Sequence, residues 1–298
     1  MNSALSIGNF DGLHIGHRKL LSSLAFLARE RDLRSVVVTY DNLPAQYLNN
    51  HSRPLLLMPA EQKKQGILGL GIDEVRVLHF DEKLAQTSAE DFLHGFIMPR
   101  LTPEIIVVGY DSHFGHKRQG DYDFLLRHAR DYGYDLHYVE PLFHAGRVVS
   151  STLVRNLLLE GGLEVANELL AAPYALYGKV VPSSGIGRQL GFPTANIELA
   201  EPNQLVPQTG VYLSRVRLEA EEFFGLTNIG SGPTLGKGGA IAIETFVIDF
   251  SGQLYGREMS VELIKYLREE KLFPSRDELI KAINEDLLRA RTILEAGL

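Results

Sequence analysis

The sequence predicts two domains of different class: an α/β domain with a parallel sheet over residues 1–172, then an antiparallel β-barrel with a C-terminal helix over residues 173–298. Three observations support this prediction. The 298 residues are enough for two hydrophobic cores. The first part alternates apolar, strand-like runs with longer amphipathic stretches. From Tyr177 onward, short alternating strands follow one another with turn residues between them.

Helical and extended segments take turns along the first half. Apolar residues at helical spacing run from Arg18 to Arg31, and further helices are expected over Pro59 to Gly69 and Ser88 to Met98. The expected strands cover residues 5–7, 35–40, 74–78 and 105–108. Repeated strand–helix units of this kind imply a parallel sheet with helices on both faces. A last helical segment, Glu164 to Leu170, precedes the expected domain boundary at Ala172-Pro173.

The second half is built from short strands and one long helix. The expected strands include residues 178–181, 211–218, 223–226 and 243–250. The amphipathic stretch from Ser275 to Leu294 is predicted to be helical, with one apolar face made of Leu279, Ile280, Ile283, Leu287 and Leu288. We therefore expect an antiparallel barrel that is followed by a helix.

Composition excludes several classes of protein. The 30 Lys and Arg against 37 Asp and Glu give a net charge of -7, which argues against a nucleic-acid partner. The absence of cysteine removes disulfides, thiolate nucleophiles and Cys-ligated metals. No run approaches the ~18 apolar residues of a membrane span, and the first residues lack a basic signal-peptide region. We expect no membrane partner and a cytoplasmic protein.

The first motif lies between the first expected strand and the following helix, at the edge where open α/β sheets bind ligands. It reads Gly8-Asn9-Phe10-Asp11-Gly12-Leu13-His14-Ile15-Gly16-His17. Gly12 and Gly16 allow close approach of a ligand, and the helix N-terminus offers N–H groups to phosphate. His14 and His17 share one side of the first helical turn and can donate hydrogen bonds to phosphoryl oxygens. The alternatives are a glycine turn with two exposed histidines, or zinc binding by the pair.

A run of hydroxyl side chains precedes the helical stretch near residue 153. Ser150, Ser151 and Thr152 can form an N-cap, and Arg155 adds a fixed positive charge one turn later. Phosphate binding and a plain helix cap are both compatible with this pattern.

The second motif reads Gly185-Ile186-Gly187-Arg188-Gln189-Leu190-Gly191-Phe192-Pro193-Thr194-Ala195-Asn196. Its glycines imitate a dinucleotide fingerprint, but Pro193 stops the helix that such a fingerprint requires. A glycine-rich flap before a proline turn suits a loop that closes on a nucleotide, with Gly185, Gly187, Arg188, Gly191 and Pro193 as the candidate contacts. Thr194 and Asn196 point to one face of an extended segment, where their oxygens can meet Mg²⁺ and phosphate. An ordinary loop is the alternative.

Glu244 is the candidate general base of the second domain. All 10 histidines lie between His14 and His144, so a base in this domain must be a carboxylate, Tyr or Lys. Glu244 follows Ile243 on a β-run and precedes Phe246, which is a poor place for a buried core carboxylate. The alternative is an outward-facing strand glutamate.

These motifs resemble those of the prokaryotic bifunctional riboflavin kinase/FAD synthetase family. Residues 8–17 are similar to its G-x-F-D-G-x-H-x-G-H signature, residues 150–155 to its S-S-T-x-x-R motif, and residues 187–196 to its riboflavin kinase signature. A further segment, residues 107–121, looks like the family's flavin-site motif and implies flavin contacts by Gly109, Asp111 and Phe114. Arg268 and Phe273, just before the C-terminal helix, are further candidates on the flavin side.

The resemblance implies a Rossmann-like nucleotidyltransferase domain and a riboflavin kinase barrel that catalyse consecutive reactions. The barrel would phosphorylate riboflavin to FMN with ATP and Mg²⁺, with Glu244 taking the proton of the riboflavin 5′-hydroxyl. The first domain would adenylylate FMN to FAD and release diphosphate, with His14, His17 and Arg155 donating to phosphoryl oxygens. Riboflavin, FMN, FAD and ATP are therefore the expected partners, and a homo-oligomer is left open.

Two departures from the family pattern motivate an alternative. The family's Pro-His-Pro-like turn after the second strand is replaced here by Tyr40-Asp41-Asn42-Leu43-Pro44. The family's aromatic residue after the aspartate at position 111 is replaced by Ser112. The alternative is an active riboflavin kinase with a degraded or regulatory N-terminal domain that binds flavin nucleotides. A third class, an RNA-interaction protein, is disfavoured by the acidic balance and the lack of basic–aromatic clusters.

Overall fold

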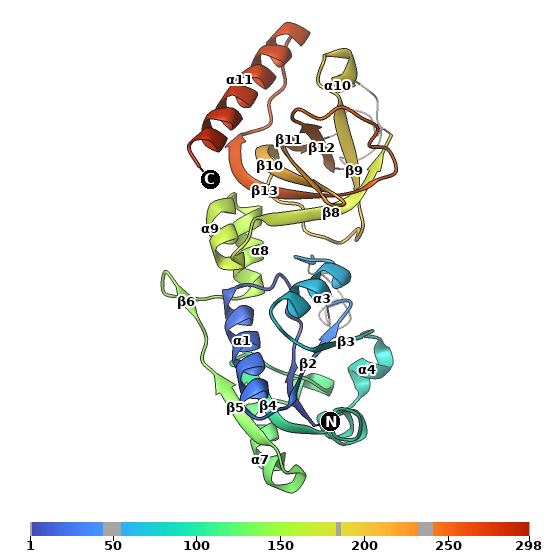
Figure 1. The fold of residues 1–298 in the computed structure, drawn as a ribbon, viewed down its shortest axis with the longest axis vertical. Coiled ribbons are helices and arrows are strands. Elements are labelled where there is room, and N and C mark those ends of the chain that lie inside the picture. The colour runs from blue at the N-terminus through green and yellow to red at the C-terminus, as the bar shows by residue number, and fades with distance from the viewer. Residues whose placement is uncertain (1, 44–54, 183–185, 232–240, 298) are drawn as a thin grey trace. The chain divides into compact units, whose positions relative to one another are not determined.

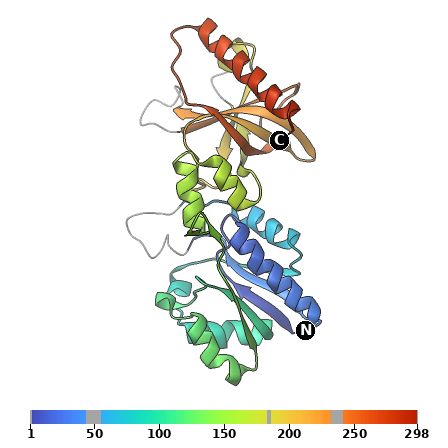
Figure 2. The same cartoon turned by 90° about the vertical axis from the view of Figure 1, so that its left-hand side faces the viewer.

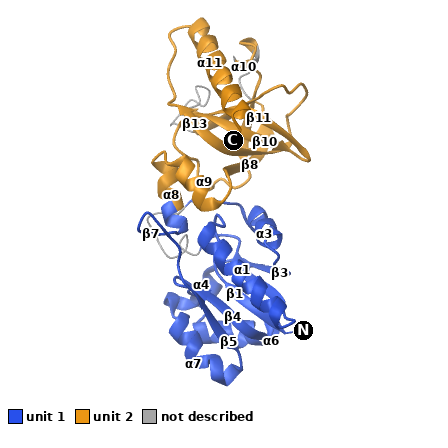
Figure 3. Cartoon of the chain, turned by 60° about the vertical axis from the view of Figure 1, so that its left-hand side comes forward, with its two compact units in different colours: residues 1–153 blue, residues 154–298 orange. Residues whose placement is uncertain are grey.

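The computed structural model describes residues 2–43, 55–182, 186–231 and 241–297, which form two compact units, residues 1–153 and 154–298 (Figure 3). The division falls inside helix α8 (Ser151–Leu159), whereas the boundary expected from the sequence follows helix α9 (Leu163–Leu170). Asn167 of α9 donates to the carbonyl oxygen of Leu263 at 2.9 Å and accepts from the N–H of Tyr174 at 2.8 Å. These bonds tie α9 to the barrel strands. As a boundary between two activities, Ala172-Pro173 stays a prediction.

Five parallel strands form the sheet of the first unit, in the order β3-β2-β1-β4-β5. Their bounds are β1 Ser3–Ile7, β2 Arg34–Tyr40, β3 Glu74–Leu78, β4 Pro103–Gly109 and β5 Asp135–Val139. The order reverses between β1 and β4, so a crevice is expected at the carboxyl ends of these two strands. The predicted parallel α/β sheet is confirmed.

Helices cover both faces of this sheet (Figures 1 and 2). Ala4 and Val37 pack on one face in a cluster with residues of α1 (Ile15–Glu30) and α3 (Ala60–Gly69). Leu5 and Val36, their chain neighbours, pack on the other face. That second face is covered by α4 Glu82–Gln86, α5 Ala89–Phe92, the π-helical turn Leu93–Ile97, α6 Met98–Leu101 and α7 Tyr122–Tyr132. Because successive side chains point to opposite covered faces, the inner strands β1, β2 and β4 are buried at almost every position, whereas the edge strands β3 and β5 carry charged residues.

The helix expected over residues 88–98 differs from the observed one. It begins at Ala89, after the Ser88 N-cap, passes through the π-helical turn and ends at Leu101. Thr102 adopts a left-handed conformation with φ of 41° and terminates it. Other short elements in the described part of this unit are the 3-10 turn η2 (His116–Arg118) and the hairpin of β6 (Phe143–His144) and β7 (Arg147–Val148).

A closed antiparallel barrel forms the second unit, in the strand order β10-β11-β12-β9-β8-β13. The strands are β8 Tyr174–Val181, β9 Thr194–Leu199, β10 Gly210–Leu218, β11 Glu221–Ser231, β12 Ile241–Val247 and β13 Glu258–Arg268, with the short helix α10 Ile186–Gln189 between β8 and β9. A row of hydroxyl groups links three neighbouring strands: Thr227 of β11 bonds Ser214 of β10 at 2.7 Å and Thr245 of β12 at 2.9 Å. All three side chains are buried. The predicted barrel is confirmed.

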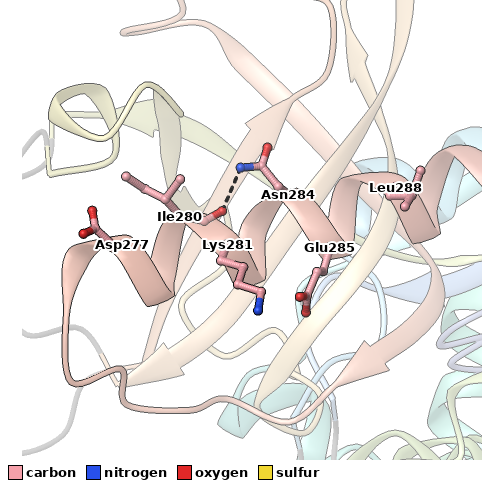
Figure 4. Close-up of a pocket in the computed structure, with 6 residues that line it drawn as sticks. All are labelled: Asp277, Ile280, Lys281, Asn284, Glu285 and Leu288. Carbon is pink, nitrogen blue, oxygen red and sulfur yellow. Dashed lines mark hydrogen bonds between the residues drawn. The ribbon is translucent and has the colours of Figure 1, made fainter.

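The C-terminal helix α11 (Arg276–Glu295) begins after its N-cap Ser275, and its apolar face was only partly predicted. Asp286 and Ala290 are the buried positions of the helix. Leu288 lies about 200° around the helix from Asp286 and is 69% exposed, so its assignment to the apolar face is wrong. Figure 4 shows Leu288 and Ile280 among the residues of a shallow hollow along α11, where the Asn284 amide donates to the Ile280 carbonyl at 2.9 Å.

Candidate active sites

The loop after β1 is held in an uncommon backbone conformation. Phe10 and Leu13 are not glycines, yet their φ angles are 49° and 47°. Such conformations cost about 1–3 kcal/mol each and persist only when their surroundings fix them. Both side chains are buried in the core. The strain therefore lies at the carboxyl end of β1, beside the point where the strand order reverses.

Hydrogen bonds of Asp11 hold this loop in place. Its carboxylate, 1% exposed, accepts hydrogen bonds from the N–H groups of Leu57 and Met58 at 3.1–3.2 Å. Its backbone carbonyl accepts from the Ser151 hydroxyl at 2.9 Å. The carboxylate thus faces the protein backbone, and a direct contact of Asp11 with a nucleotide stays a prediction.

The structure brings His14 and His17 together, as their spacing predicts. Their rings stack with centroids 3.6 Å apart, and His14 caps the N-terminus of α1 by accepting from the backbone N–H of His17 at 3.3 Å. Because Nδ1 of His14 accepts, the proton of the neutral ring is assigned to Nε2, which can donate to an anion. A Cβ added at Gly16 would stand 3.1 Å from that Nδ1, so Gly16 leaves room for the His14 ring.

The hydroxyl run before α8 behaves as a cap. The Ser150 hydroxyl accepts from the N–H of Leu153 at 3.2 Å, and Thr152 is exposed. Arg155 follows one turn later on α8 and belongs to the second unit. The predicted N-cap is observed, while phosphate binding by these residues and by Arg155 stays a prediction.

The segment after β4 also lies at the carboxyl edge of the sheet, where the strand order places the expected crevice. The Ser112 hydroxyl accepts from the N–H of Gly109 at 2.8 Å, so the residue that replaces the family aromatic stabilises the turn. Asp111 is exposed. The Phe114 ring is 6% exposed and packs edge to face with Phe124 at 5.9 Å, inside the core. Flavin contacts by Gly109, Asp111 and Phe114 stay predictions.

Two residues at this edge of the sheet had no assigned role. Lys63 of α3 is 1% exposed, and its ammonium donates to the carbonyl oxygens of Asn9 at 2.9 Å and Tyr40 at 2.6 Å. His79, directly after β3, bonds the Asp41 carboxylate at 2.7 Å, and this bond raises the pKa of His79. A lysine on an amphipathic helix carries no local signal that it is buried, so the sequence pattern alone does not reveal Lys63.

A cavity of about 450 Å³ in the second unit opens between the barrel and α11. Its lining includes several predicted residues from separate elements, namely Gly187, Thr194, Glu244, Arg268 and Phe273. Glu244 stands on β12 in register with Asn228 of β11 and Asn196 of β9. Burial raises the pKa of the Glu244 carboxyl, and its hydrogen bonding with Asn196 opposes this rise. A raised pKa makes the carboxylate a stronger base.

The glycine-rich flap closes tightly on itself before β9. The N–H of Phe192 donates to the Gly187 carbonyl at 2.8 Å, and Gly191 has a φ of 86°. A Cβ added at Gly187 would stand 2.4 Å from the Phe192 carbonyl oxygen and 3.0 Å from the Thr194 hydroxyl, so only glycine fits there. Pro193 is exposed and joins this turn to β9. Gly185 and the Arg188 side chain lie outside the described part of the chain, so their contacts stay predictions.

A charge pair lines one side of this cavity. The Arg268 guanidinium donates to the Asp286 carboxylate from Nε at 3.0 and 3.1 Å and from Nη2 at 2.8 Å. Its Cζ lies 5.5 Å from the centre of the Phe273 ring. Asp286 was not among the predicted residues, although a carboxylate on the apolar side of an amphipathic helix is itself a signal of a buried partner.

The fold and the two sites define a class: a two-domain transferase, with a strained loop at the reversal point of a parallel sheet and a carboxylate beside a glycine flap in a barrel. Residues 1–153 match the FAD synthetase family, and residues 170–294 match the riboflavin kinase family. No helix in the described part of the chain has the length and apolar character to cross a membrane.

Relatives match over nearly the whole chain. A bifunctional riboflavin kinase/FMN adenylyltransferase from Pseudomonas fluorescens is 36% identical over 97% of this chain and 92% of its own length. The protein of the same name from Escherichia coli strain K12 is 36% identical over 96% and 91%. A crystal structure of a macrolide-efflux protein from Streptococcus pneumoniae superposes with a TM-score of 0.87 at 26% identity, covering 97% of this chain and 94% of that one.

The chain therefore belongs to the family of bifunctional riboflavin kinase/FMN adenylyltransferases. The resemblance found in the sequence and the assignment to transferases with kinase and nucleotidyltransferase domains are confirmed. Both halves match their families, which supports the bifunctional interpretation rather than the alternative of a degraded N-terminal domain.

Proposed function

We propose that this chain phosphorylates riboflavin to FMN in its barrel and adenylylates FMN to FAD in its α/β unit, with ATP as the second substrate of both steps. The observation that most supports this proposal is that each unit contains a loop of constrained backbone conformation next to a side chain that can accept or donate a proton. In the first unit these are the strained loop after β1 and the stacked pair His14 and His17. In the second they are the flap at Gly187 and the carboxylate of Glu244.

In the kinase step, Glu244 removes the proton of the riboflavin 5′-hydroxyl. The oxygen then attacks the γ-phosphorus of ATP, the bond to the β,γ-bridging oxygen breaks, and ADP leaves. Glu244 suits this role because it faces the cavity with a raised pKa and lies in register with the strand that bears Thr194 and Asn196. The Arg268–Asp286 pair and the Phe273 ring form the wall on which the flavin would lie.

In the adenylyl step, a phosphate oxygen of FMN attacks the α-phosphorus of ATP and diphosphate leaves. This reaction needs positioning and neutralisation of charge more than covalent chemistry from the protein. The Nε2–H of His14 and the ring of His17 stand at the N-terminus of α1, where the helix dipole also favours an anion. Arg155 would add a fixed positive charge to the phosphoryl oxygens.

The divalent metal that kinases of this kind use is proposed to be Mg²⁺, held in the barrel by Thr194 and Asn196. Both side chains supply neutral oxygen donors on one strand next to the carboxylate of Glu244, which fits a hard cation. No cluster of three or more His, Asp or Glu in the described ranges could hold a metal by itself. This donor set fits Mg²⁺ shared with substrate phosphates, and the bound cation would neutralise charge on the transferred phosphoryl group.

We further propose that the protein acts in the cytoplasm, where ATP and riboflavin are both available, and without a nucleic-acid partner. The net charge of -7 supports the second point, since nucleic-acid binding needs concentrated Lys and Arg. Fractionation of cells that express the tagged protein, and salt-dependent binding to a generic oligonucleotide, would test these two points.

The deciding experiment supplies purified protein with riboflavin, ATP and Mg²⁺ and follows the products by chromatography. We expect FMN and then FAD. Supplying FMN directly separates the interpretations, because a stall at FMN would support a degraded first domain. No FMN from riboflavin would refute the kinase assignment.

A further inference from the structure

Lys63 is a buried cation that the proposed reactions do not use. It lies in the first turn of α3, is 1% exposed, and its ammonium donates to two backbone carbonyls. One carbonyl belongs to Asn9, in the loop after β1, and the other to Tyr40, the last residue of β2. The ammonium thus connects the ends of two neighbouring strands.

The Asn9 carbonyl receives two hydrogen bonds. The Thr39 hydroxyl donates to it at 3.0 Å and Lys63 at 2.9 Å. The preceding residue is held as well, since the N–H of Gly8 donates to the Val38 carbonyl at 3.0 Å. These bonds fix the segment immediately before Phe10, whose left-handed conformation persists only while such anchors hold.

The charged and titratable groups that act on Lys63 come from the loops after three strands. Asp11 follows β1 and Asp41 follows β2, and both carboxylates favour the protonated ammonium. His79, after β3, bonds Asp41. Burial dominates and lowers the pKa of Lys63 to about 8. The ammonium is therefore charged at neutral pH and loses its charge in the mildly alkaline range.

We propose that Lys63 is a positioning residue of the adenylyl-transfer site: its ammonium, bonded to the Asn9 and Tyr40 carbonyls, holds the loop after β1 in the conformation that receives ATP. The inference rests on the proposed adenylylation of FMN. Lys63 does not touch the reacting atoms. Its loss would loosen the loop that carries His14, so the effect falls on ATP and not on the flavin side or on the kinase.

The test compares steady-state FAD formation from FMN and ATP by the wild type, K63M, T39V and K64M. Met keeps the length of the side chain without the charge, and Lys64 is the next lysine on the same helix. We expect K63M to lower kcat/KM for ATP by about 10- to 100-fold, since charged hydrogen bonds are lost. The KM for FMN should stay unchanged, T39V should lose less than K63M, and K64M should match the wild type.

The pH dependence of kcat/KM for ATP is a second measurement, and it would not change if Lys63 served only to stabilise the fold. Wild-type kcat/KM for ATP should fall above about pH 8, as Lys63 loses its proton, and K63M should lack this alkaline fall. The chain has no cysteine, so K63C can be alkylated at that position alone with bromoethylamine to give an aminoethyl side chain. This group restores an ammonium and should restore FAD formation.

Riboflavin phosphorylation in the same preparations serves as the internal control. Selective loss of FAD formation in K63M, with rescue in alkylated K63C, supports the inference. Equal kcat/KM values for ATP in K63M and T39V would overturn it. A parallel loss of FMN and FAD formation in K63M, restored in parallel in alkylated K63C, would also overturn it, because Lys63 would then act only on the folding of the protein. If the wild type makes no FAD from FMN, the proposed function fails instead.

Discussion

Replacing Glu244 by Gln tests the kinase site most directly. The change keeps the size of the side chain and its place in the β11-β12-β9 register, and it removes only the carboxylate that accepts a proton. A positioned general base contributes about 10²–10⁴-fold to the rate, which corresponds to about 3–5 kcal/mol of transition-state free energy. We expect E244Q to lose FMN formation by this factor and to keep adenylylation of added FMN.

The raised pKa of Glu244 fixes the direction of two pH effects. Kinase kcat/KM should fall as the pH drops through this raised pKa, because the base becomes protonated. For stability, a carboxyl whose pKa is raised by folding stabilises the folded state below its unfolded pKa, and this stabilisation is lost as the pH rises through the folded pKa. The ionised carboxylate therefore opposes folding at pH 7, and neutral E244Q should melt no lower than the wild type.

The assay follows FMN from riboflavin and FAD from FMN separately, with thermal unfolding of both proteins at pH 7. Exposed Glu198 on β9 offers a matched control, and E198Q should retain both activities. If E244Q lost both activities equally, the division of labour would be refuted. If it kept FMN formation, Glu244 would not be the base.

Three further changes test other parts of the sites. H17A should lower FAD formation by about 10-fold or more without affecting FMN formation, as one charge-stabilising donor is lost, and an unchanged FAD rate would show that the phosphate site is misassigned. G187A places a Cβ 2.4 Å from the Phe192 carbonyl oxygen, so kinase kcat/KM for ATP should fall while FAD formation persists; wild-type kinetics would contradict the tight-flap geometry. D286A leaves the Arg268 guanidinium without its carboxylate partner and should cost about 3 kcal/mol of unfolding free energy in a denaturant titration, and a loss below about 1 kcal/mol would mean that the pair contributes little.

Much of the architecture was predictable because its signals are local. Short strand-like runs marked β1 to β4, alternating runs marked several barrel strands, and helical spacing marked α1 and α3, whereas β5 was not predicted. The two motifs also carry short-range geometry: His14 and His17 meet because they are three residues apart at a helix start. The exposure of Leu288 was not predictable from hydrophobicity. The buried side of the helix contains Asp286, whose charge is paired with that of Arg268, and Leu288 lies on the opposite side.

The sequence by itself determined the class of each domain, the family and the two glycine-rich motifs, since all of these depend on residues close together in the chain. Only the tertiary structure decided which distant residues hold those motifs in place. The bonds of Lys63 join residues 54 and 23 positions away, and those of Asp11 join residues 46 and 47 positions away. No local pattern encodes such contacts, because burial of a charge becomes favourable only when distant backbone groups converge on it.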